Sequence, residues 1–376
     1  MCYLGIILTK RVKASCILFG LLFSMCFSQS SDWKKKLYLE GDFHYGFVTP
    51  HMEYISYFIK DHVTGYQLNV GLLTKGEKLW HQHYNYPKIG IGIYHSGLGN
   101  NQVYGNMTSA YCYIDRYYIR GNPRFNFGNG IDFGLTYVSK RFDAKNNYFD
   151  MAIGSKFNVF INYNINGTAR INSQTYLKLG LGLMHASNGN YQEPNKGLNL
   201  FTAFGGLQYL INKPNQSDYI RSEEPKEQKR NHFMIMGALG RKQLTQQYNG
   251  KFTPLALSAE YSREITQTTM VGSSINFYFD PSLKKKLELE NDTTTGSDLL
   301  RVSWNLSYEL RMGKLSYVIQ PGIYLKNPYT KSGKISNRIG IRYQLSPRLI
   351  AGITIKAHWT AIADFIEWGI GYRWKY

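Results

Sequence analysis

Apolar side chains alternate with small or polar ones along most of this chain of 376 residues. Residues 299–310, for example, are apolar at every second position, with Arg301 and Glu309 among the residues between them. Successive side chains of a β-strand point to opposite faces, so a period of two predicts strands with one apolar face. Burying these charges in a dry sandwich core would be costly. Pointing them into the polar lumen of a barrel removes that cost, and the pattern therefore predicts a barrel.

The composition agrees with a barrel that crosses a membrane. The chain contains 31 tyrosines, 20 phenylalanines, 6 tryptophans and 36 glycines. Transmembrane β-barrels carry aromatic residues at both membrane interfaces and polar or small residues inside. After residue 30, no segment offers the run of about 18 apolar residues that a spanning helix needs. We therefore predict an all-β fold, an antiparallel transmembrane β-barrel of about 12–16 strands.

Residues 1–30 have the organisation of a secretory signal peptide. Lys10, Arg11 and Lys13 form a basic start, residues 16–27 are mainly apolar, and small serines follow. Three of the four cysteines leave with this segment, so Cys112 alone remains and the mature chain forms no internal disulfide. An exported chain without a spanning helix is periplasmic, secreted or an outer-membrane barrel.

The alternation divides the rest of the chain into sixteen predicted strands. They lie at roughly 37–48, 64–75, 87–95, 105–118, 129–139, 149–164, 174–187, 198–211, 232–242, 253–263, 267–279, 299–310, 314–326, 335–344, 348–358 and 363–376. The long charged stretch 212–231 is expected to be a polar linker or loop. It separates a first barrel region, 31–211, from further barrel strands in 232–376. The last strand has apolar residues at alternate positions and ends on Tyr376. This ending resembles the signal that outer-membrane barrels present to the barrel assembly machinery.

One strand carries candidate chemistry on its apolar face. Residues 177–187 place four leucines, His185 and Ser187 on the same side. A serine that attacks an ester needs a base close to its hydroxyl group. The pair therefore predicts a nucleophile and its base beside a surface where an acyl chain could lie.

The sequence around this pair resembles the lipid A 3-O-deacylase (PagL-like) family, or acyloxyacyl hydrolase family, of outer-membrane β-barrels. The segments that carry the resemblance are His185-Ala-Ser187-Asn188-Gly189, residues 193–199, Tyr86 to Gly92, Lys140 to Asp143 and Ala152 to Ser155. The resemblance covers about Leu37 to Ile211, and the second half has no counterpart in the small eight-stranded members of the family.

The resemblance implies an outer-membrane esterase that removes an ester-linked acyl chain from the lipid A of lipopolysaccharide. Ser187 would be the nucleophile and His185 the general base, and Asn188 and Gly189 would support the oxyanion region. The family has an acid twelve positions after the serine, where this chain has Asn199. A neutral Asn can orient a histidine but cannot offer it a negative charge. Glu193 is the alternative acid.

Charge and location predict the partners. The formal net charge is +19, and removing three basic residues with the signal leaves 41 basic against 25 acidic residues, or +16. This excess suits an anionic partner, and export favours lipopolysaccharide and outer-membrane lipids over nucleic acid. We expect no cofactor, and no metal site, because no Cys or acid joins His81 and His83 at ligand spacing.

Two alternatives stay open at this point. The chain could be a non-enzymatic barrel, a porin or a structural protein, in which Asn199 marks lost activity. Alternatively, the enzyme occupies residues 37–211 and the rest has a binding or channel role.

Overall fold

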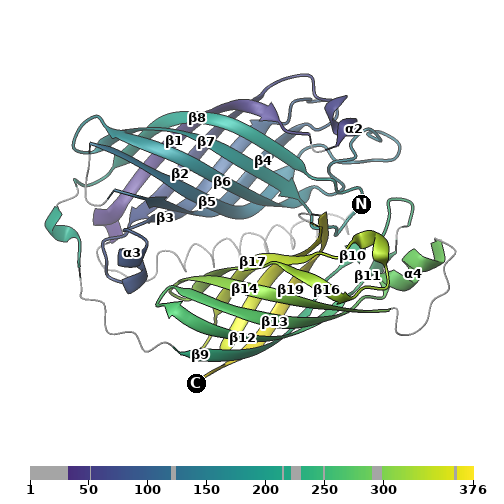
Figure 1. Cartoon of the computed structure of the whole chain (residues 1–376). Coiled ribbons are helices and arrows are strands. Elements are labelled where there is room, and N and C mark those ends of the chain that lie inside the picture. The colour runs from purple at the N-terminus through teal and green to yellow at the C-terminus, as the bar shows by residue number, and fades with distance from the viewer. Residues whose placement is uncertain are drawn as a thin grey trace, which may run out of the picture.

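The structure is a computed structural model, and it describes residues 33–50, 52–119, 124–213, 216–221, 230–248, 250–289, 299–359 and 362–376. The predicted signal peptide and residues 222–229 of the predicted linker lie outside the described residues. Figure 1 shows two barrels of antiparallel strands lying next to each other. In the described part of the chain, no helix has the length and apolar character needed to cross a membrane.

The first barrel closes on itself within residues 37–210. Its eight strands are β1 (Leu37–Val48), β2 (Val63–Leu73), β3 (Lys88–Gly97), β4 (Asn106–Tyr117), β5 (Phe125–Val138), β6 (Phe157–Arg170), β7 (Thr175–Ser187) and β8 (Leu198–Leu210). Each strand pairs with the next, and β8 returns to pair with β1, with Leu210 opposite Tyr38. Closure leaves no strand edge in this sheet with unpaired backbone groups.

The second barrel contains the strands that follow. They are β9 (Asn231–Leu239), β12 (Leu255–Thr266), β13 (Thr269–Phe279), β14 (Leu300–Met312), β15 (Leu315–Gln320), β16 (Gly322–Lys326), β17 (Ser336–Gln344), β18 (Leu349–His358) and β19 (Ile362–Lys375). β19 pairs with β9, and the pairing of β13 with β14 closes the ring. The short strands β10 (Lys242–Gln243) and β11 (Lys251–Phe252) form a separate two-stranded sheet.

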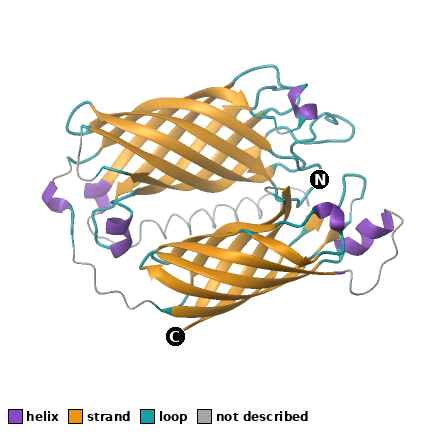
Figure 2. Cartoon of the chain, in the orientation of Figure 1, coloured by secondary structure: helices purple, strands orange, loops and turns teal. Residues whose placement is uncertain are grey.

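In the described part of the chain, helical segments are few and short (Figure 2). They are η1 (Trp33–Lys36), α2 (Glu53–Ser56), α3 (Leu79–His83), η2 (Gln216–Asp218), α4 (Ser282–Leu289) and η4 (Thr330–Ser332). In Figure 1, α2 and α4 lie at one end of the two barrels, and α3 and the chain's C-terminus lie toward the other end. The connections that contain α2 and α4, one from each barrel, therefore lie on the same side.

The predicted class, an all-β fold of antiparallel barrel strands, is confirmed. The strands are divided between two rings, whereas the sequence suggested one continuous set, because β8 pairs with β1 and not with β9. The predicted strand 314–326 is interrupted at Pro321, whose nitrogen has no hydrogen to donate, and forms β15 and β16. β13 and β14 pair along their whole length across the connection that contains α4.

The predicted strand boundaries differ most from the structure at the start of β6. The sequence suggested a strand from 149, but β6 begins at Phe157. The side chain of Asp150 accepts hydrogen bonds from the backbone N–H groups of Ala152 and Ile153 at 3.1 and 3.0 Å. These bonds stabilise a turn, and Ile153 is buried in the core as part of that turn.

Each barrel has an apolar outer surface and a polar interior. On β7, the outward side chains of Leu179 and Leu183 are 56% and 52% exposed. On the inner face of the same strand, Lys178 Nζ lies 2.8 Å from Glu40 Oε1 and 3.1 Å from Asp115 Oδ2. Side chains fill the interior of an eight-stranded barrel of this kind. The outward apolar surface is the one expected to face lipid.

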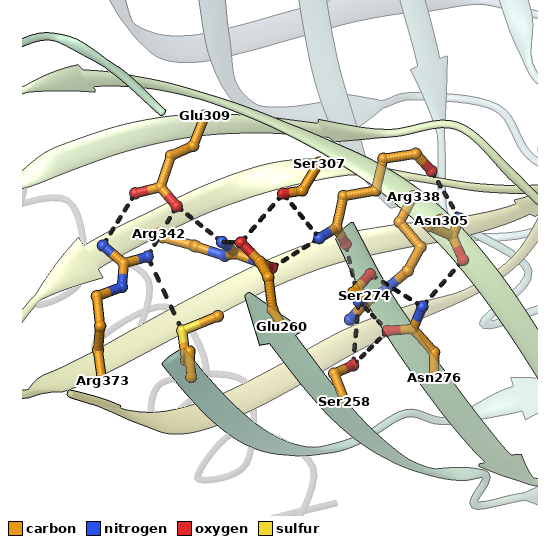
Figure 3. A network of polar contacts seen from close by, with 12 residues as sticks. Ser258, Glu260, Ser274, Asn276, Asn305, Ser307, Glu309, Arg338, Arg342 and Arg373 are labelled. Atoms are coloured by element: carbon orange, nitrogen blue, oxygen red, sulfur yellow. Dashed lines mark hydrogen bonds and ion pairs between the residues drawn. The ribbon is translucent and has the colours of Figure 1, made fainter. Parts of the chain in front are cut away.

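The second barrel has a still more strongly charged interior (Figure 3). Glu309 Oε2 lies 2.7 Å from both Arg342 and Arg373, and Arg342 also pairs with Glu260 at 2.6 Å. Arg338 hydrogen-bonds Asn276 and Gln320 at 2.8 Å each. The charged residues that the sequence placed opposite apolar positions do face inward, where carboxylates and amides pair with them.

Candidate functional site

Strands β7 and β8 bring the predicted site residues together on the outside of the first barrel. His185 is the antiparallel partner of Asn199, and Ser187 lies two residues further along β7. Alternation puts all three side chains on the outward face that also carries the leucines of β7. The loop between the two strands contains Gly189 and Gly197 at φ values of +61° and +77°, which glycine adopts without strain.

The three side chains form a hydrogen-bonded chain. His185 Nδ1 lies 2.6 Å from Asn199 Oδ1, and His185 Nε2 lies 2.9 Å from Ser187 Oγ. An amide oxygen can only accept a hydrogen bond, so the histidine donates from Nδ1. Nε2 of the neutral ring is then an acceptor for the Ser187 hydroxyl. This is the arrangement that lets a histidine act as a general base toward a serine.

Ser187 and His185 are partly enclosed by neighbouring residues and lie on the apolar outer face of the barrel. Ser187 is buried, with 7% of its surface exposed, and His185 is half-buried. A Cβ at Gly197 would come within 2.9 Å of His185 Cε1 and 3.4 Å of Ser187 Cβ. The backbone of the loop therefore packs directly against the pair, and a larger residue at Gly197 would displace it.

The loop after Ser187 is held by its own side chains. Asn188 Nδ2 donates to the Gln192 carbonyl at 2.8 Å, and the Gln192 N–H donates to Asn188 Oδ1 at 3.2 Å. The Asn188 N–H donates to Asn195 Oδ1 at 2.9 Å. The side chain and backbone amide of Asn188 thus make local hydrogen bonds that shape the turn. The structure places Gly189 next to it, where a Cβ would lie 2.4 Å from Ile366 of the second barrel.

Glu193, the alternative acid, lies in the same loop with different partners. Its Oε2 accepts a hydrogen bond from the Asn195 N–H at 3.1 Å. Burial raises the pKa of its carboxyl, and Lys196 opposes that shift. Both ring nitrogens of His185 already have partners in Asn199 and Ser187. Asn199 therefore holds the position next to His185 that an orienting residue needs.

A neighbouring turn supports the site from the other side. The Gly197 N–H donates to the Ala152 carbonyl at 2.9 Å. Ala152 belongs to the turn stabilised by Asp150, which is fully buried. Burial raises the pKa of the Asp150 carboxyl to about 7, against the opposing effect of the two backbone N–H groups. The turn that the sequence mistook for a strand thus positions the glycine that packs on His185.

The second barrel contributes residues that the sequence did not single out. The backbone N–H of Gln243 in β10 donates to the Asn190 carbonyl at 3.0 Å, and Gln243 Oε1 accepts from the Glu193 N–H at 3.1 Å. Lys251 Nζ in β11 lies 3.3 Å from the centre of the Tyr191 ring. The loop that follows Ser187 is therefore attached to the second barrel. No local pattern around residue 243 signals this contact, because its partners lie about fifty residues earlier.

Among the described residues, no group of three or more His, Cys, Asp or Glu side chains is arranged to hold an ion. His81 Nδ1 lies 3.2 Å from Glu77 Oε2, and burial lowers the pKa of His81 to about 4. His81, within α3, is therefore paired with Glu77 just before the helix.

Solved structures similar to this chain include a porin and a hydrocarbon channel. A mutant of the Rhodopseudomonas blastica porin is 8% identical, with 90% of this chain and 99% of that chain covered and a TM-score of 0.17. A TodX mutant, a monoaromatic hydrocarbon channel, is 9% identical, with 90% and 89% covered and a TM-score of 0.17. A comparison with curated proteins finds no match.

Two family models match the chain, one for each barrel. Residues 64–208 match lipid A 3-O-deacylase (PagL), and residues 231–376 match the C-terminal domain of acyloxyacyl hydrolase. The first match contains Ser187, His185 and Asn199, and the second contains Gln243. The two matches together span most of both barrels. The chain belongs to the lipid A 3-O-deacylase (PagL) family and carries the C-terminal domain of acyloxyacyl hydrolases.

Proposed function

We propose that this protein is an outer-membrane esterase that removes an ester-linked acyl chain from lipid A through Ser187 and His185. The family match supports the substrate class. The observation that carries the chemistry is the hydrogen-bonded chain from Asn199 through His185 to Ser187, with distances of 2.6 and 2.9 Å. Residues of these types at these distances suit nucleophilic attack on an ester.

The reaction has two stages. Ser187 Oγ attacks the ester carbonyl carbon, and His185 Nε2 takes the hydroxyl proton. The bond between this carbon and the sugar oxygen breaks, the sugar oxygen receives the proton from His185, and an acyl group remains on Ser187. Water then attacks the acyl carbon and gives a proton to His185. The bond to Oγ breaks, the proton returns to Ser187, and a free fatty acid leaves.

Asn199 is the proposed orienting residue. Its amide oxygen fixes the ring of His185 with Nε2 toward Ser187. A carboxylate at this place would also stabilise the imidazolium that forms during the reaction, which a neutral amide does less well. Asn188 and Gly189 are the proposed support of the oxyanion region, because they form the turn directly after the nucleophile.

The position of the site suits a membrane lipid as substrate. The leucines of β7 form an outward apolar row that leads to His185. An acyl chain lying along this row would bring its ester to the end of the strand. We place this end in the outer leaflet, where lipopolysaccharide resides. The apolar exterior also supports outer-membrane localisation, and exposed Trp368 and Ile370 near the C-terminus support recognition by the barrel assembly machinery.

The interiors of the two barrels give less support to the alternative that this protein is a porin. In the first barrel, Lys178 bridges Glu40 and Asp115, and Tyr38 and Tyr113 meet with their hydroxyl oxygens 2.6 Å apart. In the second barrel, arginines and carboxylates cross the interior. Open porins keep an aqueous channel through a wider ring of strands.

The deciding experiment measures fatty acid release from lipid A by the purified full-length protein in detergent. We expect Ser187→Ala and His185→Ala each to reduce the rate by several orders of magnitude while the barrel remains folded. Mass spectrometry of a rapidly quenched parent reaction should detect an acyl group on the peptide that contains Ser187. Ser109→Ala, at a buried serine inside the first barrel, is the matched control. Parental activity of Ser187→Ala would place the nucleophile elsewhere.

A further inference from the structure

The second barrel has a cavity at the end opposite the Ser187 site. We propose that this cavity binds a phosphate-type oxyanion. It has a volume of about 260 Å³ and lies where β9 begins and β19 ends, next to α3 of the first barrel. The volume is sufficient for a phosphate group and part of the molecule that carries it. This site is independent of the deacylation chemistry proposed above.

The cavity wall is strongly basic. Five cationic side chains line it, and the lining contains no acidic residue. They are Arg311, Lys314, Arg342, Arg373 and Lys375. Behind them, the arginines pair with three carboxylates, those of Glu260, Glu264 and Glu309. The five cationic side chains and the three carboxylates together carry a formal charge of +2, and the electric field of this charge attracts an anion.

Three arginines of the cavity wall each have a buried donor that lacks a partner. Within the described part of the chain, no hydrogen-bond acceptor is found for Nε of Arg311, Arg342 or Arg373. The side chains of Arg342 and Arg373 are 3% and 7% exposed. A guanidinium N–H that is buried without an acceptor is costly. One oxyanion with three or four oxygens can accept from several such groups, and arginine matches phosphate well in geometry.

The first barrel completes the wall. Trp80 of α3 also lines the cavity, and its indole Nε1 is a fourth buried donor without an acceptor in the described structure. A Cβ at Gly313 would lie 3.2 Å from this Nε1, so the indole packs on the turn between β14 and β15. The Tyr84 hydroxyl lies 3.5 Å from the Thr268 carbonyl oxygen. Contacts from both barrels therefore hold the indole at the site.

Water alone is the competing occupant, because polar cavities of this size are often hydrated. A water molecule donates as well as accepts, whereas these four N–H groups can only donate. An oxyanion satisfies them with acceptors and balances the positive charge. Its source is either the phosphate of a lipid headgroup or a soluble phosphate compound.

The test uses the full-length protein in a phosphorus-free maltoside detergent at low salt. Inorganic phosphate and dihexanoyl phosphatidic acid are titrated separately, and binding is measured by calorimetry and by ³¹P line broadening. We expect saturable binding that weakens as salt is added. Tighter binding of phosphatidic acid identifies a lipid headgroup as the source, and equal or weaker binding identifies soluble phosphate. Either result supports the oxyanion site.

Two variants locate the binding. Lys314→Gln with Lys375→Gln removes two charges at the exposed rim, and Trp80→Phe removes one donor while keeping an aromatic ring. We expect each to raise the Kd about fivefold or more. Lys334→Gln, at an exposed position on the other end of the same barrel, should leave the Kd unchanged. Heat-modifiable migration on gels checks folding. No saturable binding by the parent, or equal Kd values in folded parent and variants, would show that the cavity holds water only.

Discussion

The side-chain oxygen of Gln243, in the second barrel, accepts a hydrogen bond from the backbone N–H of Glu193, in the first barrel, at 3.1 Å. Gln243 Nε2 donates in turn to the carbonyl oxygens of Thr245 and Tyr248 at 3.0 and 3.1 Å, so this amide is fixed from both sides. Glu193 lies six residues after Ser187. The second barrel thereby constrains the loop that follows the proposed nucleophile.

We therefore expect Gln243→Ala to lower the deacylation rate about three- to tenfold, since a hydrogen bond contributes about 1 kcal/mol. The loss arises because the loop after Ser187 becomes less ordered, so the melting temperature should change little. Initial rates on lipid A and thermal unfolding measure the two effects. Gln344→Ala, at the other end of the same barrel, should retain the parental rate. Unchanged activity of Gln243→Ala would show that the loop is ordered without this contact.

His185 could be oriented by Asn199 or by Glu193, and these two hypotheses make opposite predictions for mutants. The contact between Asn199 and His185 predicts a fall of about 10²-fold or more for Asn199→Ala, because the ring loses its preferred orientation. Asn199→Glu should retain or raise activity, since a carboxylate stabilises the imidazolium. Glu193→Gln should be nearly silent. Rates of all three variants on one lipid A substrate decide the matter, and the reverse order would assign the orienting role to Glu193.

The charge network inside the second barrel predicts a strong effect on stability. Glu309→Ala leaves Arg342 and Arg373 without the carboxylate that both contact at 2.7 Å. Removing one partner of a buried ion pair typically costs about 3–5 kcal/mol. We expect a lower free energy of unfolding in urea at constant detergent. Tyr308→Phe, the outward neighbour on β14, should change it by less than about 1 kcal/mol. A parental value for Glu309→Ala would mean that the network contributes little.

The raised pKa of Asp150 predicts that the free energy of unfolding depends on pH. Burial raises the pKa of its carboxyl from 3.8 to about 7, so the folded protein binds more protons here than the unfolded chain between these values. Its contribution to the free energy of unfolding therefore falls as the pH rises from about 4 to 7, by up to about 1.4 kcal/mol per pKa unit. Asp150→Asn should flatten this part of the profile and stabilise the protein at pH 8.

Asp143→Asn is the control for this effect. Backbone N–H groups of Lys145 and Asn146 lower the pKa of the exposed Asp143 carboxyl. Its contribution has the opposite sign: it is present above the unfolded pKa and is lost as the pH falls through the folded pKa. The slope between about pH 4 and 7 should therefore survive in Asp143→Asn. An unchanged slope in Asp150→Asn would assign it to other groups.

Much of the local structure follows from alternation in the sequence. The strand ending at Ser187 was predictable because leucines occupy every second position from 177 to 183, and a strand was also predicted for residues 198–211. Because alternate side chains of a strand share a face, His185, Ser187 and Asn199 could all be placed on the outward face from the sequence. The start of β6 was not predictable from the alternation of apolar and polar residues. The side chain of Asp150 makes hydrogen bonds within a turn, and these bonds compete with strand formation.

The sequence by itself determined most of the strands, their faces and the residues of the proposed site, since each depends on side chains close together in the chain. The tertiary structure alone decided that β8 closes on β1, that the remaining strands form a second ring, and that Gln243 reaches the loop after Ser187. The physical reason is that backbone hydrogen bonds between strands are nearly the same for any partner. The choice of partner depends on closing each ring and filling its interior with paired side chains from distant strands.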